Sequence, residues 1–249
     1  MAWVETPSPS FAARHESDEA DEAIQVLDEL EAFRERMQGL FERTPGEVSV
    51  VIHPHPLMLA LAHPWLPVAR FVAAPASRRY FAGWFGSKEI HVLSRPVLEA
   101  RASSVEGSRE ALLLTPQHEY AHLVVAANNP DLPPPFTPAS FRRYVRWAWL
   151  SEGAATYFSG QTPHLRAAIA RRLHEGDRPR FPPSPGDAQL LGGTVFALLE
   201  EEAGPEAAVA LARSRDSRGW RAAIQDSFGR PAAEVGPLWR DYVESLTGA

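Results

Sequence analysis

The segment that most constrains the fold is residues 115–130, TPQHEYAHLVVAANNP, because it combines an apolar helix pattern with ionisable side chains in one turn. Thr115 is a suitable N-cap, and Pro116 is suited to the first helical position. The helix is expected to stop near residues 128–130, where two asparagines precede a proline. The two histidines of the segment therefore lie on a helix, and the fold has to be compatible with that placement.

His118 and His122 are four residues apart, and in a helix residues i and i+4 lie one above the other on the same face. Their rings can therefore supply two metal ligands from one turn. Glu119 leans over the same opening, close enough to hydrogen-bond a metal-bound water without binding the metal itself. Hydrolytic zinc sites combine three protein ligands with one open position, and two histidines with a glutamate form one such set. The pattern predicts a further glutamate ligand downstream.

Glu152 is the best candidate for that third ligand, because it stands in WLSEGAATYF, residues 149–158, on an expected helix. The three small residues that follow Glu152 would let this helix pack closely against the first. Twenty-nine residues separate His122 from Glu152, and they include the proline-rich loop 131–138 that can reverse the chain. Three other glutamates are poorer choices, since they stand among charged residues typical of solvent-exposed faces: Glu175, Glu200 and Glu201.

The remaining elements follow from periodicity and turn residues. Apolar spacing from Ile24 to Leu40 predicts an amphipathic helix, and the runs 47–54 (EVSVVIHP) and 88–93 (KEIHVL) predict strands. In the segment AGWFGS, residues 82–87, Gly83 and Gly86 suggest a turn just before the second strand. Further helices are expected from Thr137 through WLSEGAATYF and at residues 194–202, 205–213 and 235–246. Strands in the first half and helices in the second indicate an α+β fold.

We expect residues 1–16, rich in proline, serine and mixed charge, to be a flexible lead-in. Residues 17–249 would then form a single domain, since one core is common in chains of this size. Within it, residues 17–115 would supply the N-terminal helix and the sheet. Residues 116–249 would form the helical part that carries the candidate site.

Composition narrows the classes of site and partner. The 249 residues include no cysteine, so a metal would have to be held by histidine and carboxylate side chains. A formal net charge of -6 argues against non-specific binding to nucleic acid or to an anionic membrane. The first residues lack the basic start and apolar core of a signal peptide, and no apolar run reaches the ~20 residues of a membrane span. We therefore expect a soluble, cytoplasmic protein.

HEYAH followed by WLSEGAATYF resembles the gluzincin, or peptidase MA-like, metallopeptidases, and the order of elements from about residue 20 to residue 246 is similar to theirs. The resemblance implies a zincin-like fold: a small mixed sheet with an edge strand over an active-site helix, then a mostly helical half. It also implies peptide-bond hydrolysis, with Zn²⁺ held by His118, His122 and Glu152 and with Glu119 activating a zinc-bound water. The partner would be a peptide or protein substrate.

The resemblance also implies residues that bind the substrate. In zincins an edge strand binds extended peptide by strand addition, and KEIHVL would play that part here through Ile90 and His91, with Tyr157 as a further substrate-binding residue. Many relatives carry an oxyanion-stabilising tyrosine at the start of the helix after the glutamate segment. Matching the tails places Gln189 there, so its amide would be the catalytic donor. Three alternatives for that donor are Tyr157, Tyr144 and His174.

Other interpretations stay open. His53 and His55 point to one side of a predicted strand and could form a second metal site, although each is followed by proline and the pair more simply marks a strand end. The chain could be a catalytically silent zincin-like binding or regulatory domain with structural zinc, but such a site has no need of Glu119. A metal-dependent hydrolase of non-peptide substrates is a third alternative. Motifs of serine hydrolases and of phosphate-binding loops are absent.

Overall fold

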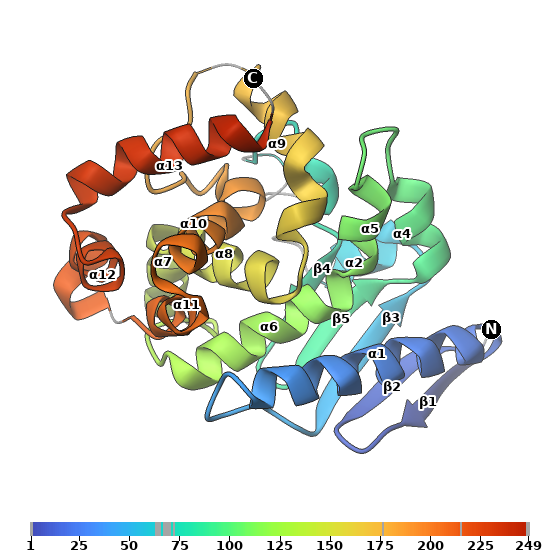
Figure 1. The fold of residues 1–249 in the computed structure, drawn as a ribbon. Coiled ribbons are helices and arrows are strands. Elements are labelled where there is room, and N and C mark those ends of the chain that lie inside the picture. Colours follow the sequence, from blue (N-terminus) through green and yellow to red (C-terminus); the bar gives the residue numbers. More distant parts are fainter. Residues whose placement is uncertain are drawn as a thin grey trace.

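The computed structural model describes residues 2–62, 66, 71, 73–175, 177–214 and 216–247. Its strands form one mixed sheet in the order β1-β2-β3-β5-β4, beside a larger helical layer (Figure 1). The expected α+β class is confirmed. Bounds of the strands are β1 Trp3–Pro7, β2 Phe11–Glu16, β3 Val48–His53, β4 Gly83–Phe85 and β5 Glu89–Leu93.

The N-terminal segment belongs to the sheet, so the expectation of a flexible lead-in at residues 1–16 is wrong. β1 pairs antiparallel with β2, and β2 pairs parallel with β3. Phe11, Ala13 and His15 face the core from β2, and His15 Nε2 lies 2.8 Å from the hydroxyl oxygen of Thr6. A buried face that contains one alanine and one histidine gives a weak apolar alternation, which is why the sequence pattern missed these strands.

The edge strands of the sheet are β1 and β4, and the expectation that KEIHVL forms an edge strand is wrong. β5 pairs parallel with β3 on one side and antiparallel with β4 on the other. The segment AGWFGS was expected to be a turn, but Gly83–Phe85 is extended and only the following residues turn, with Gly86 N donating to Glu89 O at 2.7 Å. Aromatic residues favour strands, and here they outweigh the flanking glycines.

Helix α6 (Thr115–Asn128) runs through the middle of the molecule, with α1 (Ala20–Gln38) on one side and α8 (Ala148–Phe158) on the other (Figure 1). Residues 115–125 are all buried. The helix begins at Thr115, whose hydroxyl donates to Leu112 O at 2.6 Å and does not cap the helix as expected. Burial on all sides explains why α6 can hold polar side chains away from water.

The early helix follows its predicted spacing in part. Four residues of the predicted stripe are buried on α1, which packs against β2 and α6: Leu27, Leu30, Phe33 and Met37. Ile24 and Leu40, at the two ends of the predicted stripe, are exposed. The helix ends at Gln38, so Leu40 lies beyond it.

The segment that follows the proline loop forms two helices, where one continuous stretch was expected. α7 (Pro138–Arg146) begins with the expected cap, in which Ser140 N donates to the Thr137 hydroxyl, and the chain breaks at Trp147 before α8. Gly153 of α8 lies against Gly192 of α10 (Ala188–Ala203), because a Cβ added at Gly153 would lie 2.6 Å from the Gly192 backbone. The small residues therefore permit close packing of α8 on α10 as well as its contact with α6.

Further α-helices belong to the described part of the chain. They are α2 Pro56–Ala62, α4 Arg95–Arg101, α5 Ser108–Leu113, α9 Arg166–Leu173, α11 Pro205–Ala212, α12 Gly219–Phe228 and α13 Ala232–Leu246. Of these, α11 and α13 were expected, whereas the helix expected at residues 194–202 begins at Ala188, in α10. In the part of the chain that the structure describes, no helix is long and apolar enough to cross a membrane.

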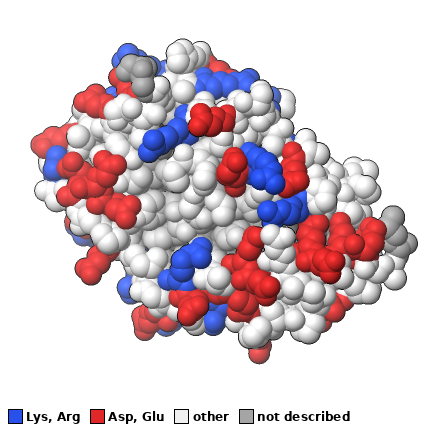
Figure 2. All heavy atoms as spheres, turned by 45° about the vertical axis from the view of Figure 1, so that its right-hand side comes forward, with Lys and Arg blue, Asp and Glu red and all other residues white. Residues whose placement is uncertain are grey.

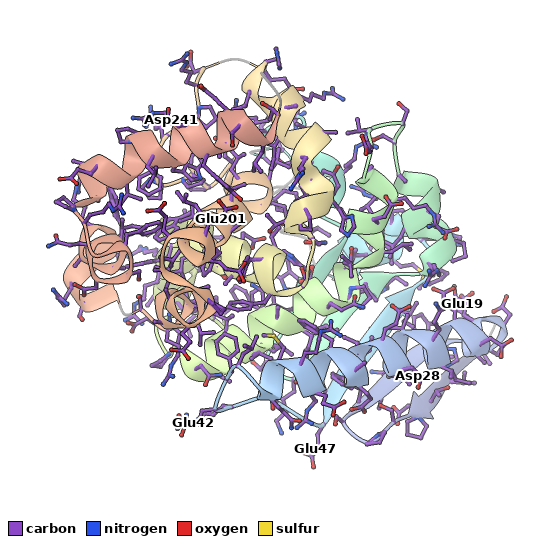
Figure 3. The ribbon with its side chains drawn as sticks, viewed as in Figure 1. Glu19, Asp28, Glu42, Glu47, Glu201 and Asp241 are labelled. Carbon is purple, nitrogen blue, oxygen red and sulfur yellow. The ribbon has the colours of Figure 1, made fainter. Side chains whose placement is uncertain are left out.

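Charged side chains are distributed over the surface as solvated groups. Acidic and basic residues are interspersed on the face shown in Figure 2. Glu42 and Glu47 are exposed and point away from the molecule in Figure 3. Buried acidic side chains such as Glu119 and Glu152 therefore stand apart from the general acidity of the chain.

Candidate metal centre

Three buried side chains converge between α6 and α8. His118 and His122 come from one face of α6, and their Nε2 atoms lie 3.2 Å apart. Glu152 reaches them from α8, with Oε2 3.4 Å from His118 Nε2 and Oε1 3.5 Å from His122 Nε2. The three residues expected as metal ligands are thus brought together, although thirty-three residues lie between His118 and Glu152 in the sequence.

These separations fit a shared metal ion. Ligand atoms bound tetrahedrally at about 2.0–2.1 Å from an ion lie about 3.3 Å from one another. The measured separations of 3.2 to 3.5 Å agree with that value. Among the described residues, this is the group of three histidine or acidic side chains whose ligand atoms all lie within 4.8 Å of one another. The group could therefore hold a metal ion.

The electrostatics of the group favour the protonation states that coordinate a cation. Burial lowers the pKa of His122 to about 3, so its imidazole is neutral at pH 7. Burial would raise the pKa of Glu152, but interactions with His122, His118 and Tyr144 outweigh it and lower that pKa to about 2. A neutral imidazole and an ionised carboxylate are the forms in which these side chains bind metals.

Neighbouring residues hold two of the three ligands in orientation. The Phe85 ring of β4 stacks on the His122 ring, with centroids 4.1 Å apart and planes at 17°. Ser151 Oγ lies 3.3 Å from His122 Nδ1, and the Tyr144 hydroxyl donates to Glu152 Oε1. Such outer contacts fix ring and carboxylate orientation in metal sites. The sequence offered Tyr144 only as an oxyanion donor and did not single out Phe85.

Glu119 lies beside the group without being part of it. Its carboxyl is buried against the backbone of β4, since a Cβ added at Gly83 would lie 2.4 Å from Glu119 Oε1. Burial, and then the charge of Glu152, raise the pKa of Glu119 well above its ordinary value. Gly83 is therefore needed for the close packing of β4 against Glu119. The sequence did not indicate this role, because glycines in a segment such as AGWFGS are typical of a turn.

A cavity of about 160 Å³ opens at the three convergent residues. Glu119, Gln189 and Tyr144 are polar residues of its lining, and most of the rest is apolar. Two of the candidate oxyanion donors, Gln189 and Tyr144, are therefore at the site. The other two candidates, Tyr157 and His174, do not line the cavity.

Tyr157 stacks on Phe196 at 5.8 Å, and burial, followed by Glu200, raises its pKa. Neither ring lines the cavity, so the structure does not place Tyr157 where a substrate-binding or oxyanion residue would stand. His174 is exposed at the end of α9, with Nδ1 2.7 Å from Ala170 O. The sequence offered both residues as alternatives for the oxyanion donor, and Tyr157 was also expected to bind substrate.

The strand residues expected to bind substrate also lie away from the cavity. Ile90 faces the core, and His91 faces the opposite side of the sheet, where its Nδ1 lies 2.9 Å from His53 Nε2. His55 is exposed beyond the end of β3. The structure therefore pairs His53 with His91 of the neighbouring strand, and within the described ranges no three-ligand group includes His53 or His55.

Comparisons with known proteins add no assignment. The chain matches no protein-family model, and no curated protein matches it in sequence. A functional interpretation therefore rests on the geometry of the candidate metal centre and on the motifs that carry it.

Proposed function

We propose that this protein is a zinc-dependent hydrolase of peptide bonds with a zincin-like fold, in which His118, His122 and Glu152 hold the metal. The observation that carries the proposal is the position of Glu119. A buried carboxyl that is not a ligand, but lines the same cavity as three convergent ligands, is what a general base requires.

Two histidines and one glutamate are a known ligand set of hydrolytic zinc sites and leave one position open. Zinc held there would supply a water of lowered pKa, ~7, and a Lewis acid for the carbonyl oxygen. Glu119 would accept the proton as the water oxygen bonds to the carbonyl carbon. It would return that proton to the nitrogen as the carbon–nitrogen bond breaks.

Two side chains in the cavity can donate hydrogen bonds to the oxygen that gains charge. Gln189 offers its amide from the first turn of α10, and Tyr144 offers a hydroxyl that already points at Glu152. Donors placed at such an oxygen typically contribute ~10²- to 10³-fold in rate. Gln189 therefore remains our candidate for the catalytic donor, with Tyr144 as the alternative.

The sheet edge gives the proposal a place for the peptide backbone. β4 is the last strand in the order of the sheet, and its Gly83 packs on Glu119. An extended peptide that pairs with an exposed edge strand gains main-chain hydrogen bonds and a fixed register. β4 thus takes the role that the sequence suggested for KEIHVL.

The resemblance of HEYAH and WLSEGAATYF to gluzincins supports the same function, and the helix-borne motif followed by a helix-borne glutamate agrees with it. A silent zincin-like domain is the alternative. Against it stands the energetic cost of burying Glu119, because a structural site gains nothing from a second buried carboxyl near Glu152.

The test is the Glu119→Gln variant, whose amide keeps the shape of the side chain and removes the base. We expect it to retain bound zinc and to lose peptide hydrolysis by at least ~10²-fold. Glu42→Gln, a surface change, is the matched control and should behave as wild type. Equal hydrolysis by the Glu119 variant would contradict the proposal, and a zinc-loaded wild type that cleaves no member of a broad peptide library would favour the silent domain.

A further inference from the structure

Helix α7 has an apolar stripe that the protein core covers only in part. Phe141, Tyr144 and Val145 stand at helical spacing on one face, while three arginines occupy other positions of the helix. A strongly amphipathic helix usually buries its apolar stripe. In α7, however, no residue is fully buried, and Phe141 and Val145 are each 41% exposed.

The stripe faces the cavity of the candidate metal centre. Phe141, Tyr144 and Val145 line it from α7, and Trp84 and Phe85 line it from β4. Phe136, just before α7, packs between the two walls, with ring centroids 5.2 Å from Phe85 and 6.0 Å from Tyr144. The unburied face of α7 is therefore one wall of a pocket whose other wall is the edge strand.

The charges around this pocket disfavour polar and charged substrate side chains. Its lining, as far as the described residues show it, holds no lysine or arginine, and its acidic groups are Glu119 and Glu152 at the metal end. An acidic side chain held between the apolar walls would find no lysine or arginine to pair with among the described lining residues, and burying an unpaired charge is costly. A lysine side chain would lose its hydration against aromatic walls, which is costly for a charged group.

We propose that this pocket is the specificity subsite of the enzyme and that it takes one apolar side chain, aromatic or leucine-sized, from a residue next to the scissile bond. The proposal rests on the peptidase function proposed above. Bound substrate would cover Phe141 and Val145, each of which is 41% exposed. The size agrees as well: an apolar cavity of about 150 Å³ accommodates benzene, and this cavity, its metal end included, measures about 160 Å³.

Peptide pairs that differ at one residue test the preference. Libraries with Phe, Leu, Ala, Asp or Lys on either side of the scissile bond should show kcat/KM for Phe or Leu above that for Ala by about 10- to 200-fold at one of the two positions. Asp and Lys should be poorer than Phe or Leu at that position. Hydrolysis without an apolar preference on either side would overturn this inference and leave the peptidase function standing.

Substitutions in α7 test the assignment of the wall. Val145→Phe should fill the pocket, lowering kcat/KM for the Phe peptide by at least about 10-fold while sparing the Ala peptide. Phe141→Ala should reduce the ratio of kcat/KM between Phe and Ala peptides. Arg143→Ala, on another face of the same helix, is the control and should leave the ratio unchanged, and zinc content should be equal in all variants. An unchanged ratio in both wall variants would overturn the assignment.

A binding measurement separates the pocket from the chemistry. Toluene titrated into the wild-type protein, followed by nuclear magnetic resonance, should bind saturably, and Val145→Phe but not Arg143→Ala should abolish binding. Toluene binding in a protein that cleaves no peptide would keep the apolar subsite and overturn the peptidase function. Absence of both toluene binding and an apolar preference in hydrolysis would overturn the subsite.

Discussion

The part of the chain that the structure describes contains two buried pairs of histidines, and they differ in the groups that lie next to their ring nitrogens. His118 and His122 stand on one helix with their rings at 83°, and both Nε2 atoms lie within 3.5 Å of the carboxylate of Glu152. His53 and His91 stand on adjacent strands with their rings stacked at 17°, and His53 Nε2 lies 2.9 Å from His91 Nδ1.

The comparison teaches that burial of histidines does not by itself make a metal centre. In the strand pair, the two facing nitrogens are engaged with each other. One carboxylate near that pair belongs to Glu89, whose side chain is 49% exposed and whose Oε1 lies 3.5 Å from His91 Nε2. In the helix pair, both facing nitrogens share a space with a buried carboxylate, and a cavity opens beside them. Convergence of three donors is the feature that distinguishes the two.

The largest expected effect is on metal binding. His118→Ala or His122→Ala should weaken zinc affinity by more than ~100-fold, because loss of a neighbour that merely orients a ligand already costs ~10- to 100-fold. His91→Gln, in the strand pair, should leave affinity unchanged. Competition with a chelator of known affinity measures all three. Full zinc affinity in both helix variants, or loss of zinc affinity in His91→Gln, would contradict the conclusion that the helix pair and not the strand pair binds the metal.

A second expected effect concerns the base, which the strand pair lacks. Gly83→Ala would place a methyl carbon 2.4 Å from Glu119 Oε1, which is too close, so the carboxyl has to move. A displacement of ~1 Å can lower turnover by ~10²-fold. Zinc content should be retained, because the three atoms nearest to the added methyl all belong to Glu119, which is not a member of the group that could hold the metal. Gly39→Ala, at the end of α1, is the control, because its added Cβ would also be closely packed, 3.3 Å from Arg36 O, but away from the candidate metal centre. Normal turnover in Gly83→Ala would show that the position of Glu119 does not matter.

A smaller effect should come from the hydroxyl that orients Glu152. Tyr144→Phe removes the hydrogen bond to Glu152 Oε1 and should lower zinc affinity by ~10- to 100-fold. Tyr157→Phe is the matched control, since Tyr157 lies outside the cavity and should leave affinity unchanged. Equal affinities for the two variants would mean that the hydroxyl of Tyr144 does not support the ligand.

The smallest expected effect is a pH dependence of stability from the strand pair. Burial, then Arg14, lower the pKa of His91 to about 4, below its ordinary value of 6.5. The unfolded chain therefore binds a proton first, and the free energy of unfolding should fall as pH drops from 6.5 toward 4. In metal-free protein, His91→Gln should lose less stability over this interval, by on the order of 1 kcal/mol. Parallel curves from urea unfolding would contradict the assignment.

Sequence reasoning found the ligands because their signals are local. On a helix, a spacing of four residues places His118 and His122 on the same face. A glutamate within a run of small and apolar residues is conspicuous on a later expected helix. The α+β class followed from the distribution of strands and helices. Strand order did not follow, because whether a strand is central or at the edge depends on partners far away in sequence.

The residues around the site were harder to find than the ligands. Phe85 and Gly83 act through contacts with α6, more than thirty positions away, and nothing in AGWFGS announces those contacts. The pairing of His53 with His91 likewise depends on the register between β3 and β5. Tyr157, although near Glu152 in sequence, is turned away by the helix. Local patterns cannot encode such long-range contacts.

The most direct test of the central claim is a crystal structure of zinc-loaded protein with anomalous scattering recorded at the zinc edge. We predict one strong anomalous peak per chain, about 2.0–2.2 Å from His118 Nε2, His122 Nε2 and a carboxylate oxygen of Glu152. A strong peak at His53 and His91 instead, or no peak at the helix pair when zinc is in excess, would contradict the account.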